Sequence, residues 1–169
     1  EITNIDVIDK MPNDFGEIDV FFCQVDDCEK VLVEKIKTSK KVDCAFFELG
    51  LKSVEGALRE KEYRLIVDDR HLEKTALNAV SDERSALMHN KFCVYDNRFV
   101  STGSFNPTLN DAKKNDNNLV VIGSISLAKN YKDEFEEMYG GSFGKGDFVK
   151  YSRINFNGNL IENYFCPED

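Results

Sequence analysis

The sequence has few histidines and no long apolar run, and both shortages narrow what the protein can be. Among its 169 residues, no stretch has the length of a transmembrane helix and none has the features of a signal peptide. It contains 2 histidines, His71 and His89, and no His or Cys pair has the spacing of zinc ligands. We therefore expect neither a metal ion nor another cofactor.

Positive charge is also scarce, since the net charge is −9 and the isoelectric point is about 4.8. This sign argues against a general nucleic-acid binder, because phosphate backbones attract basic surfaces. An anionic substrate would need a local basic site. The candidate cations lie in one part of the chain: Lys91, Arg98, Lys113 and Lys114.

The 5 cysteines fall into two groups and a single residue, Cys166. Cys44 lies in an apolar run and Cys93 in the polar-apolar stretch that follows His89, so both are expected to be buried free thiols. Cys23 and Cys28 lie at the end of one strand and in the first turn of the next helix. That short separation allows a disulfide if the compartment is oxidising.

Strands and helices alternate along residues 18–150, and 41% hydrophobic residues suffice for the core of one α/β domain. Residues 1–17 are expected to be an irregular lead-in and residues 106–118 a loop. The expected strands are Ile18 to Val25, Val42 to Leu49, Tyr63 to Val67 and Leu119 to Ile122. Four helices are expected. One follows Asp26 or Asp27, one begins at a Ser53 cap, and a weak one spans Leu72 to Val80. The fourth carries the apolar stripe Leu127, Tyr131, Phe135 and Met138.

A hairpin in the middle of the chain carries the polar residues with the clearest chemistry. Two strands, Leu87 to Tyr95 and Phe99 to Ser104, are predicted on either side of an Asp96-Asn97 turn. His89 and Lys91 are two residues apart, so they share one face of the strand. An imidazole can attack phosphorus or transfer a proton, and a neighbouring ammonium offsets the negative charge of the phosphate.

The second strand ends in residues that suit the same ligand. Gly103 allows the backbone to approach a bound group closely, and Ser104 and Asn106 supply neutral hydrogen-bond donors. We expect Lys91, Ser104 and Asn106 to bind the phosphate and His89 to carry out the chemistry.

These residues together resemble the HKD motif of the phospholipase D superfamily, and in particular its compact nuclease-like members. The motif positions are His89, Lys91, Asp96, Gly103, Ser104 and Asn106. The resemblance implies an α/β/α sandwich with a mixed, largely parallel central sheet. It also implies metal-independent phosphodiester cleavage through a phosphohistidine, with His89, Lys91, Ser104 and Asn106 catalytic and with Asp96 and Gly103 structural.

The family mechanism needs two histidines at one phosphate, and this motif supplies one. His71 follows the third strand and has the pattern of a surface helix histidine, although ligand sites do gather at that end of a strand. The second histidine is therefore expected from a dimer mate, or from a second phospholipase D-like domain. A two-fold dimer would place two copies of the motif face to face.

The sequence departs from the family pattern after the motif. Nuclease-like members usually have Asn-x-Glu-Asn there, with the Glu orienting a histidine, whereas this chain has Asn117 at the Glu position. An amide can hydrogen-bond an imidazole but cannot stabilise an imidazolium by charge. Asn117 is thus a candidate for orienting the histidine, and His89 is open to two roles, nucleophile or leaving-group acid.

The end of the chain suggests a repeat. A hairpin with an Asn157-Gly158 turn is predicted within residues 151–169. Residues 162–169 then resemble residues 19–26 at a constant offset, so we expect the first strand of a truncated second copy. This resembles the first half of archaeal tandem phospholipase D-like proteins. An N-terminal membrane anchor upstream of Glu1, with an extracytoplasmic location, is part of that expectation.

Three functions are compatible with these features. The first is a phosphodiesterase acting on nucleic acid, favoured by the compact size and by the lack of an apolar lipid-binding segment. The second is a phospholipase D or phosphatidyl transferase acting on lipids. The third is an inactive phosphate-binding module.

Overall fold

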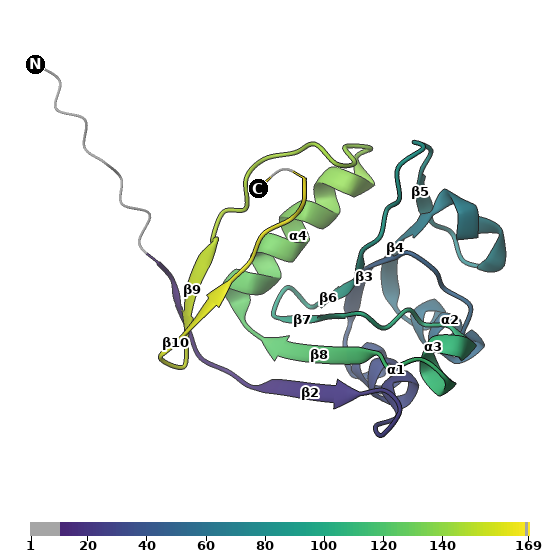
Figure 1. Cartoon of the computed structure of the whole chain (residues 1–169), viewed down its shortest axis with the longest axis horizontal. Coiled ribbons are helices and arrows are strands. Elements are labelled where there is room, and N and C mark those ends of the chain that lie inside the picture. The colour runs from purple at the N-terminus through teal and green to yellow at the C-terminus, as the bar shows by residue number, and fades with distance from the viewer. Residues whose placement is uncertain (1–10, 168) are drawn as a thin grey trace, which may run out of the picture.

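A computed structural model describes residues 11–167 and 169 (Figure 1). The strands of the main sheet are β2 (Ile18–Phe22), β3 (Lys41–Phe46), β4 (Glu62–Asp68), β5 (Val80–Asp82), β6 (Lys91–Tyr95), β7 (Phe99–Gly103) and β8 (Asn118–Gly123). The helices are α1 (Cys28–Thr38), α2 (Lys52–Arg59), the 3₁₀ helix η1 (Asp69–Lys74), α3 (Leu109–Lys113) and α4 (Ile125–Tyr139). A smaller sheet contains β1 (Asn13–Asp14), β9 (Arg153–Phe156) and β10 (Asn159–Glu162).

The main sheet has the strand order β2-β8-β7-β6-β3-β4-β5 and is mixed, which confirms the predicted fold class. The expectation of a largely parallel sheet is wrong, because most strand pairs are antiparallel. Only β3-β4 and β4-β5 are parallel, whereas β2-β8, β8-β7, β7-β6 and β6-β3 are antiparallel. A tight turn joins β6 to β7, and tight turns join antiparallel neighbours, while the helical crossover through α2 returns the chain parallel.

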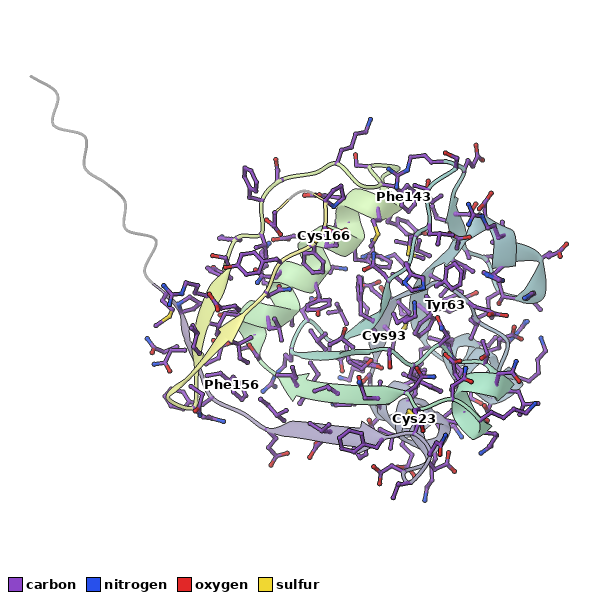
Figure 2. All side chains as sticks on the ribbon, viewed as in Figure 1. Cys23, Tyr63, Cys93, Phe143, Phe156 and Cys166 are labelled. Atoms are coloured by element: carbon purple, nitrogen blue, oxygen red, sulfur yellow. A yellow bond between two sulfur atoms is a disulfide. The ribbon has the colours of Figure 1, made fainter. Side chains whose placement is uncertain are left out.

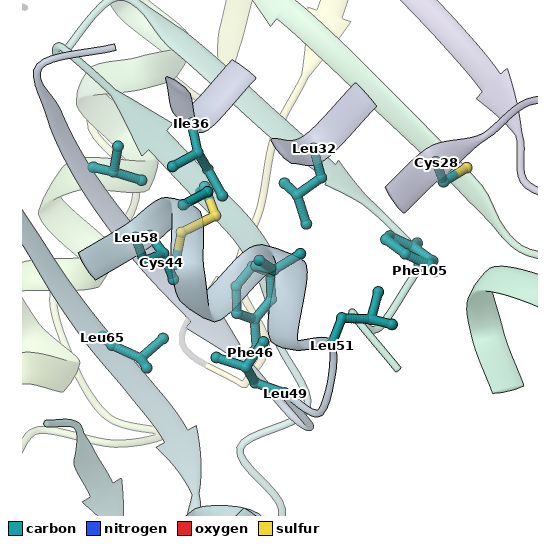
Figure 3. Close-up of a cluster of buried hydrophobic side chains, with 14 of the residues drawn as sticks. Cys28, Leu32, Ile36, Cys44, Phe46, Leu49, Leu51, Leu58, Leu65 and Phe105 are labelled. Carbon is teal, nitrogen blue, oxygen red and sulfur yellow. A yellow bond between two sulfur atoms is a disulfide. The ribbon is translucent and has the colours of Figure 1, made fainter. Parts of the chain in front are cut away.

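Helices cover both faces of the sheet, as in the expected sandwich. On one face, α1 begins at Asp27, whose side chain accepts a hydrogen bond from the backbone N–H of Lys30 (3.1 Å), and it buries Cys28, Leu32 and Ile36 at helical spacing. These side chains meet those of α2 and of β3 and β4 in one apolar cluster (Figure 3). Burial of each large aliphatic side chain stabilises the fold by about 1.5–3 kcal/mol.

The other face of the sheet is covered by α4 and by the β9-β10 hairpin beside it (Figure 1). The predicted stripe is confirmed, since Leu127, Phe135 and Met138 are buried there. A buried charge also fixes the helix: Asp43 of β3 pairs with Arg64 (2.7 Å) and with Lys132 of α4. Losing both partners would leave an uncompensated buried carboxylate.

The cysteines of the central strands differ from the prediction of free thiols. Cys44 and Cys93 are directly opposite in the β3-β6 pair, 4.1 Å apart between Cα atoms, and they form a disulfide in the core (Figure 2). The flanking backbone bonds, from Asp96 N to Lys41 O and from Phe47 N to Asn90 O, make this a non-hydrogen-bonded pair, in which Cα atoms lie closest. No residue next to either cysteine specifies the register between these strands. Cys23 and Cys28 are also bonded, and Cys166 is free and exposed.

Three local predictions are corrected. The weak helix over Leu72 to Val80 is not formed, because η1 ends at Lys74 and β5 begins at Val80. The loop over residues 106–118 contains α3, which Thr108 caps by accepting a hydrogen bond from Asp111 N (3.2 Å). Ser53 lies inside α2 instead of capping it, and its hydroxyl donates to Glu29.

The smaller sheet contains the predicted terminal hairpin, with Asn157 and Gly158 both at positive φ in its turn. The lead-in is not wholly irregular, because β1 pairs with β9; residues 1–10 of it lie outside the described residues. Residues 163–167 belong to no strand, and Phe165 packs on Tyr131 with 5.0 Å between ring centroids. The second repeat stays a prediction. Within the described residues, no helix is long and apolar enough to span a bilayer.

Candidate functional site

The predicted site residues lie at one edge of the main sheet, where β3, β4 and β5 end, β6 begins and β7 ends. His89 lies in the loop just before β6, and two backbone contacts hold this loop. The buried carboxylate of Asp68, at the end of β4, accepts a hydrogen bond from Met88 N (2.9 Å). The backbone carbonyl of Asn90 accepts one from Phe47 N (2.8 Å), so His89 is fixed on both sides.

Lys91 is the first residue of β6, and its ammonium turns back toward His89. Its Nζ donates to the carbonyl oxygen of His89 (2.8 Å) and lies 5.1 Å from the centroid of the Phe47 ring. Partial burial lowers the pKa of Lys91, and the negative charge of Asp111 opposes this shift. A neighbouring carboxylate thus favours the charged form of Lys91.

The imidazole of His89 is exposed at this edge, with its ring centroid 4.8 Å from that of Phe47. Loss of solvent on the inner side lowers the pKa of His89 from 6.5, and the charge of Lys91 lowers it further, against the opposing effect of Asp68. The neutral imidazole is therefore favoured near neutral pH, and a neutral imidazole has the lone pair needed to attack phosphorus.

Gly103 and Ser104 continue β7 opposite the start of β6. Gly103 has φ +141°, and a Cβ atom there would lie 2.5 Å from the backbone oxygen of Asn118, so only glycine fits. Ser104 is exposed, and its hydroxyl oxygen accepts a hydrogen bond from Asn118 N (3.1 Å). The hydroxyl hydrogen can still be donated to a ligand.

Asn106 is held by a residue that the sequence analysis missed. Asp111 accepts hydrogen bonds from Asn106 N (2.8 Å) and Asn106 Nδ2 (2.9 Å) and is buried in α3. The buried Oδ1 of Asn106 has no hydrogen-bond partner among the described residues. The sequence did offer a signal, because Thr108 followed three residues later by Asp111 is a helix-start pattern.

Two of the predicted residues lie away from this edge. Asp96 and Arg98 lie at the hairpin turn, beyond the opposite end of β6. At the usual rise per residue, the two ends of this strand, Lys91 and Tyr95, are about 13 Å apart. Asp96 accepts hydrogen bonds from Lys40 N (3.0 Å) and Lys41 N (2.9 Å), which ties the turn to β3. Arg98 is therefore not a cation of the site.

The other predicted residues are placed as follows. Lys113 lies 3.9 Å from Glu29 on α1, in an exposed ion pair, and Lys114 is exposed beside it. The side-chain Nδ2 of Asn117 is buried and has no hydrogen-bond partner among the described residues. Its role in orienting a histidine thus remains a prediction.

His71 differs from the surface helix histidine that was expected. It lies in η1 with its side chain 17% exposed and its ring centroid 4.6 Å from that of Phe47. Its Nδ1 lies 3.8 Å from Glu48 Oε1, and Lys74 pairs with the same carboxylate (2.8 Å). Both histidines of the sequence thus contact the Phe47 ring.

A pocket of about 370 Å³ adjoins His89 on the α4 side. Its walls are residues 86–90, the end of α4 and residues 164–167, and Figure 2 shows Phe143 and Cys166 on this side of the molecule. The lining is mixed: polar residues such as His89, Asn90 and Glu134 lie among apolar ones such as Leu87, Met138 and Phe143. Within the part of the chain that the structure describes, no group of three His, Cys, Asp or Glu side chains is placed to hold a metal ion.

Comparison with known proteins agrees with this architecture. Residues 38–139 match the family described as cardiolipin synthase, PLD-like domain. Mitochondrial cardiolipin hydrolase of Xenopus laevis is 26% identical over 125 residues, which are 65% of this chain and 60% of that protein. The chain thus spans well under two thirds of this relative's length.

Solved structures show the same fold. Nuc of Salmonella typhimurium, a phospholipase D family member, superposes with a TM-score of 0.67 at 20% identity, over 73% of this chain and 94% of Nuc. TrmBL2, an archaeal chromatin protein with a novel mode of DNA binding, gives a TM-score of 0.52 at 12% identity, over 75% of this chain and 53% of TrmBL2. With a family match over more than half of its length, the chain belongs to the phospholipase D superfamily, among the cardiolipin synthase PLD-like domains.

Proposed function

We propose that the protein is a phosphodiester hydrolase that acts through a phosphohistidine at His89. The observation that carries the proposal is the convergence of His89, Lys91 and Asn106 at one sheet edge, with an imidazole that is neutral near pH 7 beside a cation. The family supports phosphodiester chemistry in general, and these residues are the ones with the groups for it.

The reaction has two steps. In the first, a ring nitrogen of His89 attacks phosphorus, a P–N bond forms, and the bond to the leaving oxygen breaks while a second histidine protonates that oxygen. In the second, the second histidine takes a proton from water, the water oxygen attacks phosphorus, and the P–N bond breaks to release the phosphate and His89. Lys91 offsets negative charge on the nonbridging oxygens, and Ser104 and Asn106 donate hydrogen bonds to them.

The second histidine is best supplied by another copy of the motif. Within this chain, the His71 side chain is only 17% exposed and lies beside Glu48, whereas His89 is exposed at the edge where a partner could approach. A homodimer, or a second phospholipase D-like domain, would bring a second exposed imidazole to the same phosphate.

We propose nucleic acid as the first substrate class. The edge is open and polar, with exposed His89 and Ser104, and such a site fits a flexible phosphodiester backbone whose bases remain outside. TrmBL2 has the same fold and binds DNA, so the fold is compatible with this polymer.

A phospholipid is the second candidate, and the pocket beside His89 is the observation that favours it. Apolar side chains in this mixed pocket, such as Leu87 and Phe143, could contact the first part of an acyl chain next to the attacked phosphate, and its polar groups could contact the glycerol. The cardiolipin hydrolase of Xenopus laevis is the relative whose name indicates such a substrate.

A substrate panel in excess EDTA tests the proposal. Single-stranded DNA, duplex DNA, RNA and phosphatidyl lipid vesicles would be compared for the wild type, His89→Asn and the matched control His71→Asn. We expect cleavage of one substrate class in EDTA, lost in His89→Asn and retained in His71→Asn. Specific activity should fall on dilution if a dimer supplies the second histidine. Activity that needs added Mg²⁺, or that survives His89→Asn, would refute the mechanism.

A further inference from the structure

Asp111 is buried at a place where a carboxylate is costly. It lies in the first turn of α3, and its residue is only 8% exposed. No salt bridge reaches it within the described part of the chain, so its charge is compensated by hydrogen bonds and by more distant charges. A buried carboxylate needs such compensation, because water stabilises the free ion strongly.

Three hydrogen bonds converge on this carboxylate, and two of them come from one residue of the proposed site. Oδ2 accepts from the backbone N (2.8 Å) and the side-chain Nδ2 (2.9 Å) of Asn106, and Oδ1 accepts from Asn115 Nδ2 (2.6 Å). Holding both the main chain and the amide of Asn106 fixes its side-chain torsions. The second amide hydrogen of Asn106 then keeps one direction, which is what a donor to a phosphate oxygen requires.

The same charge acts on Lys91. Asp111 is the carboxylate whose field opposes the burial-driven fall in the pKa of Lys91. It therefore helps the ammonium to remain charged where solvent is partly excluded. Asn117 is uncharged, and Asp111 supplies negative charge to this side of the site from α3.

We propose that Asp111 is a positioning residue of the phosphate site, acting through Asn106. This inference rests on the proposed function, since it assigns Asp111 to the same site. Phospholipids and nucleic acids both contain a phosphodiester, so the role of Asp111 does not depend on which of them is the substrate.

A double-mutant cycle tests the assignment. Rates on bis(4-nitrophenyl) phosphate would be measured for the wild type, Asp111→Asn, Asn106→Ala and the double variant, with the exposed neighbour Asp116→Asn as the matched control. Because Asp111→Asn keeps the shape of the side chain but weakens charge-assisted bonds, we expect kcat to fall about 10- to 100-fold with little change in KM. The same substitution should cost much less in the Asn106→Ala background, and Asp116→Asn should match the wild type.

The outcomes are distinguishable from failure of the proposed function. If the wild type does not hydrolyse the diester, the cycle is repeated on the dissociation constant of inorganic phosphate, which reports the site without turnover. If Asp111→Asn does not fold, Asn115→Ala removes one partner of Asp111 from an exposed position, and a smaller loss of the same kind is expected. The inference would be overturned if Asp111→Asn reduced the measured rate or phosphate affinity equally in the wild type and in Asn106→Ala. It would also be overturned if Asp111→Asn caused no reduction. A wild type that neither hydrolyses the diester nor binds phosphate would overturn it together with the function.

Discussion

Replacing Asp68 by Asn should strongly reduce kcat/KM while the protein stays folded, because Asp68 holds the loop that presents His89. The carboxylate is fully buried, with one oxygen accepting from Arg70 N (3.2 Å) and the other from Met88 N (2.9 Å). An asparagine has one acceptor oxygen, so it can serve only one of these two donors. The other N–H would face an amide NH₂ group.

The magnitude follows from that lost bond. Leaving one buried backbone N–H without an acceptor costs about 1–3 kcal/mol of folding free energy. For a chain of this size, each 1 kcal/mol lowers the melting temperature by about 2–4 °C. The loop carrying His89 is the part that can relax, and a displacement of about 1 Å of a reacting group can reduce the rate about 100-fold. We therefore expect a folded variant with kcat/KM reduced by roughly two orders of magnitude.

The pH profile separates this role from simple destabilisation. The negative charge of Asp68 raises the pKa of His89 against burial and Lys91, so its removal lowers that pKa further. Neutral His89 is the attacking form, and the acid limb of kcat/KM should shift to lower pH. The exposed Asp69→Asn is the matched control and should leave both the rate and the profile unchanged. An unshifted acid limb, or a full wild-type rate in Asp68→Asn, would show that Asp68 does not position His89.

Three further results are expected. Gly103→Ala should destabilise the fold by more than about 2 kcal/mol in denaturant titration, since its Cβ would meet the Asn118 oxygen at positive φ; an unchanged midpoint would contradict the close approach. Unfolded, unreduced protein made under oxidising conditions should show one reactive thiol, that of Cys166, and five would mean that neither disulfide forms. The wild-type rate should be bell-shaped, with an acid limb below the 6.5 of an ordinary histidine because burial lowers the pKa of His89, and with an alkaline limb where the second histidine, the leaving-group acid, loses its proton.

Local chemistry in the sequence was enough to predict the hairpin and much of the core. The Asp96-Asn97 turn forms with both residues at positive φ, and Leu127, Phe135 and Met138 of the predicted stripe are buried. The helix cap at Asp27 also forms. Each of these features depends on residues within one or two turns of each other, and such signals are present in the chain itself.

Features that depend on pairing between distant strands could not be predicted in this way. The antiparallel register of β3 and β6 places Cys44 opposite Cys93, and nothing local to either cysteine specifies that register. Arg98 differs, because it directly follows the predicted Asp96-Asn97 turn, and the hairpin alone was enough to place it at the far end of β6. Asp111 was missed for a different reason, because its partner Asn106 was assigned to the ligand and not to the protein.

Asp68 and Asp111 anchor the two halves of the site in the same way. Each is a buried carboxylate on an element outside the hairpin, and each accepts a backbone N–H next to or at a functional residue, from Met88 before His89 and from Asn106 itself. The disulfide from Cys44 to Cys93 fixes the strands behind them independently. The loops of the proposed phosphate site can therefore be perturbed through either carboxylate while the sheet stays intact. A chain with a net charge of −9 can keep these two carboxylates close to the proposed anion site, because Asp68 and Asp111 face the protein's own donors. The groups left for the ligand are the imidazole, the ammonium and the neutral amide.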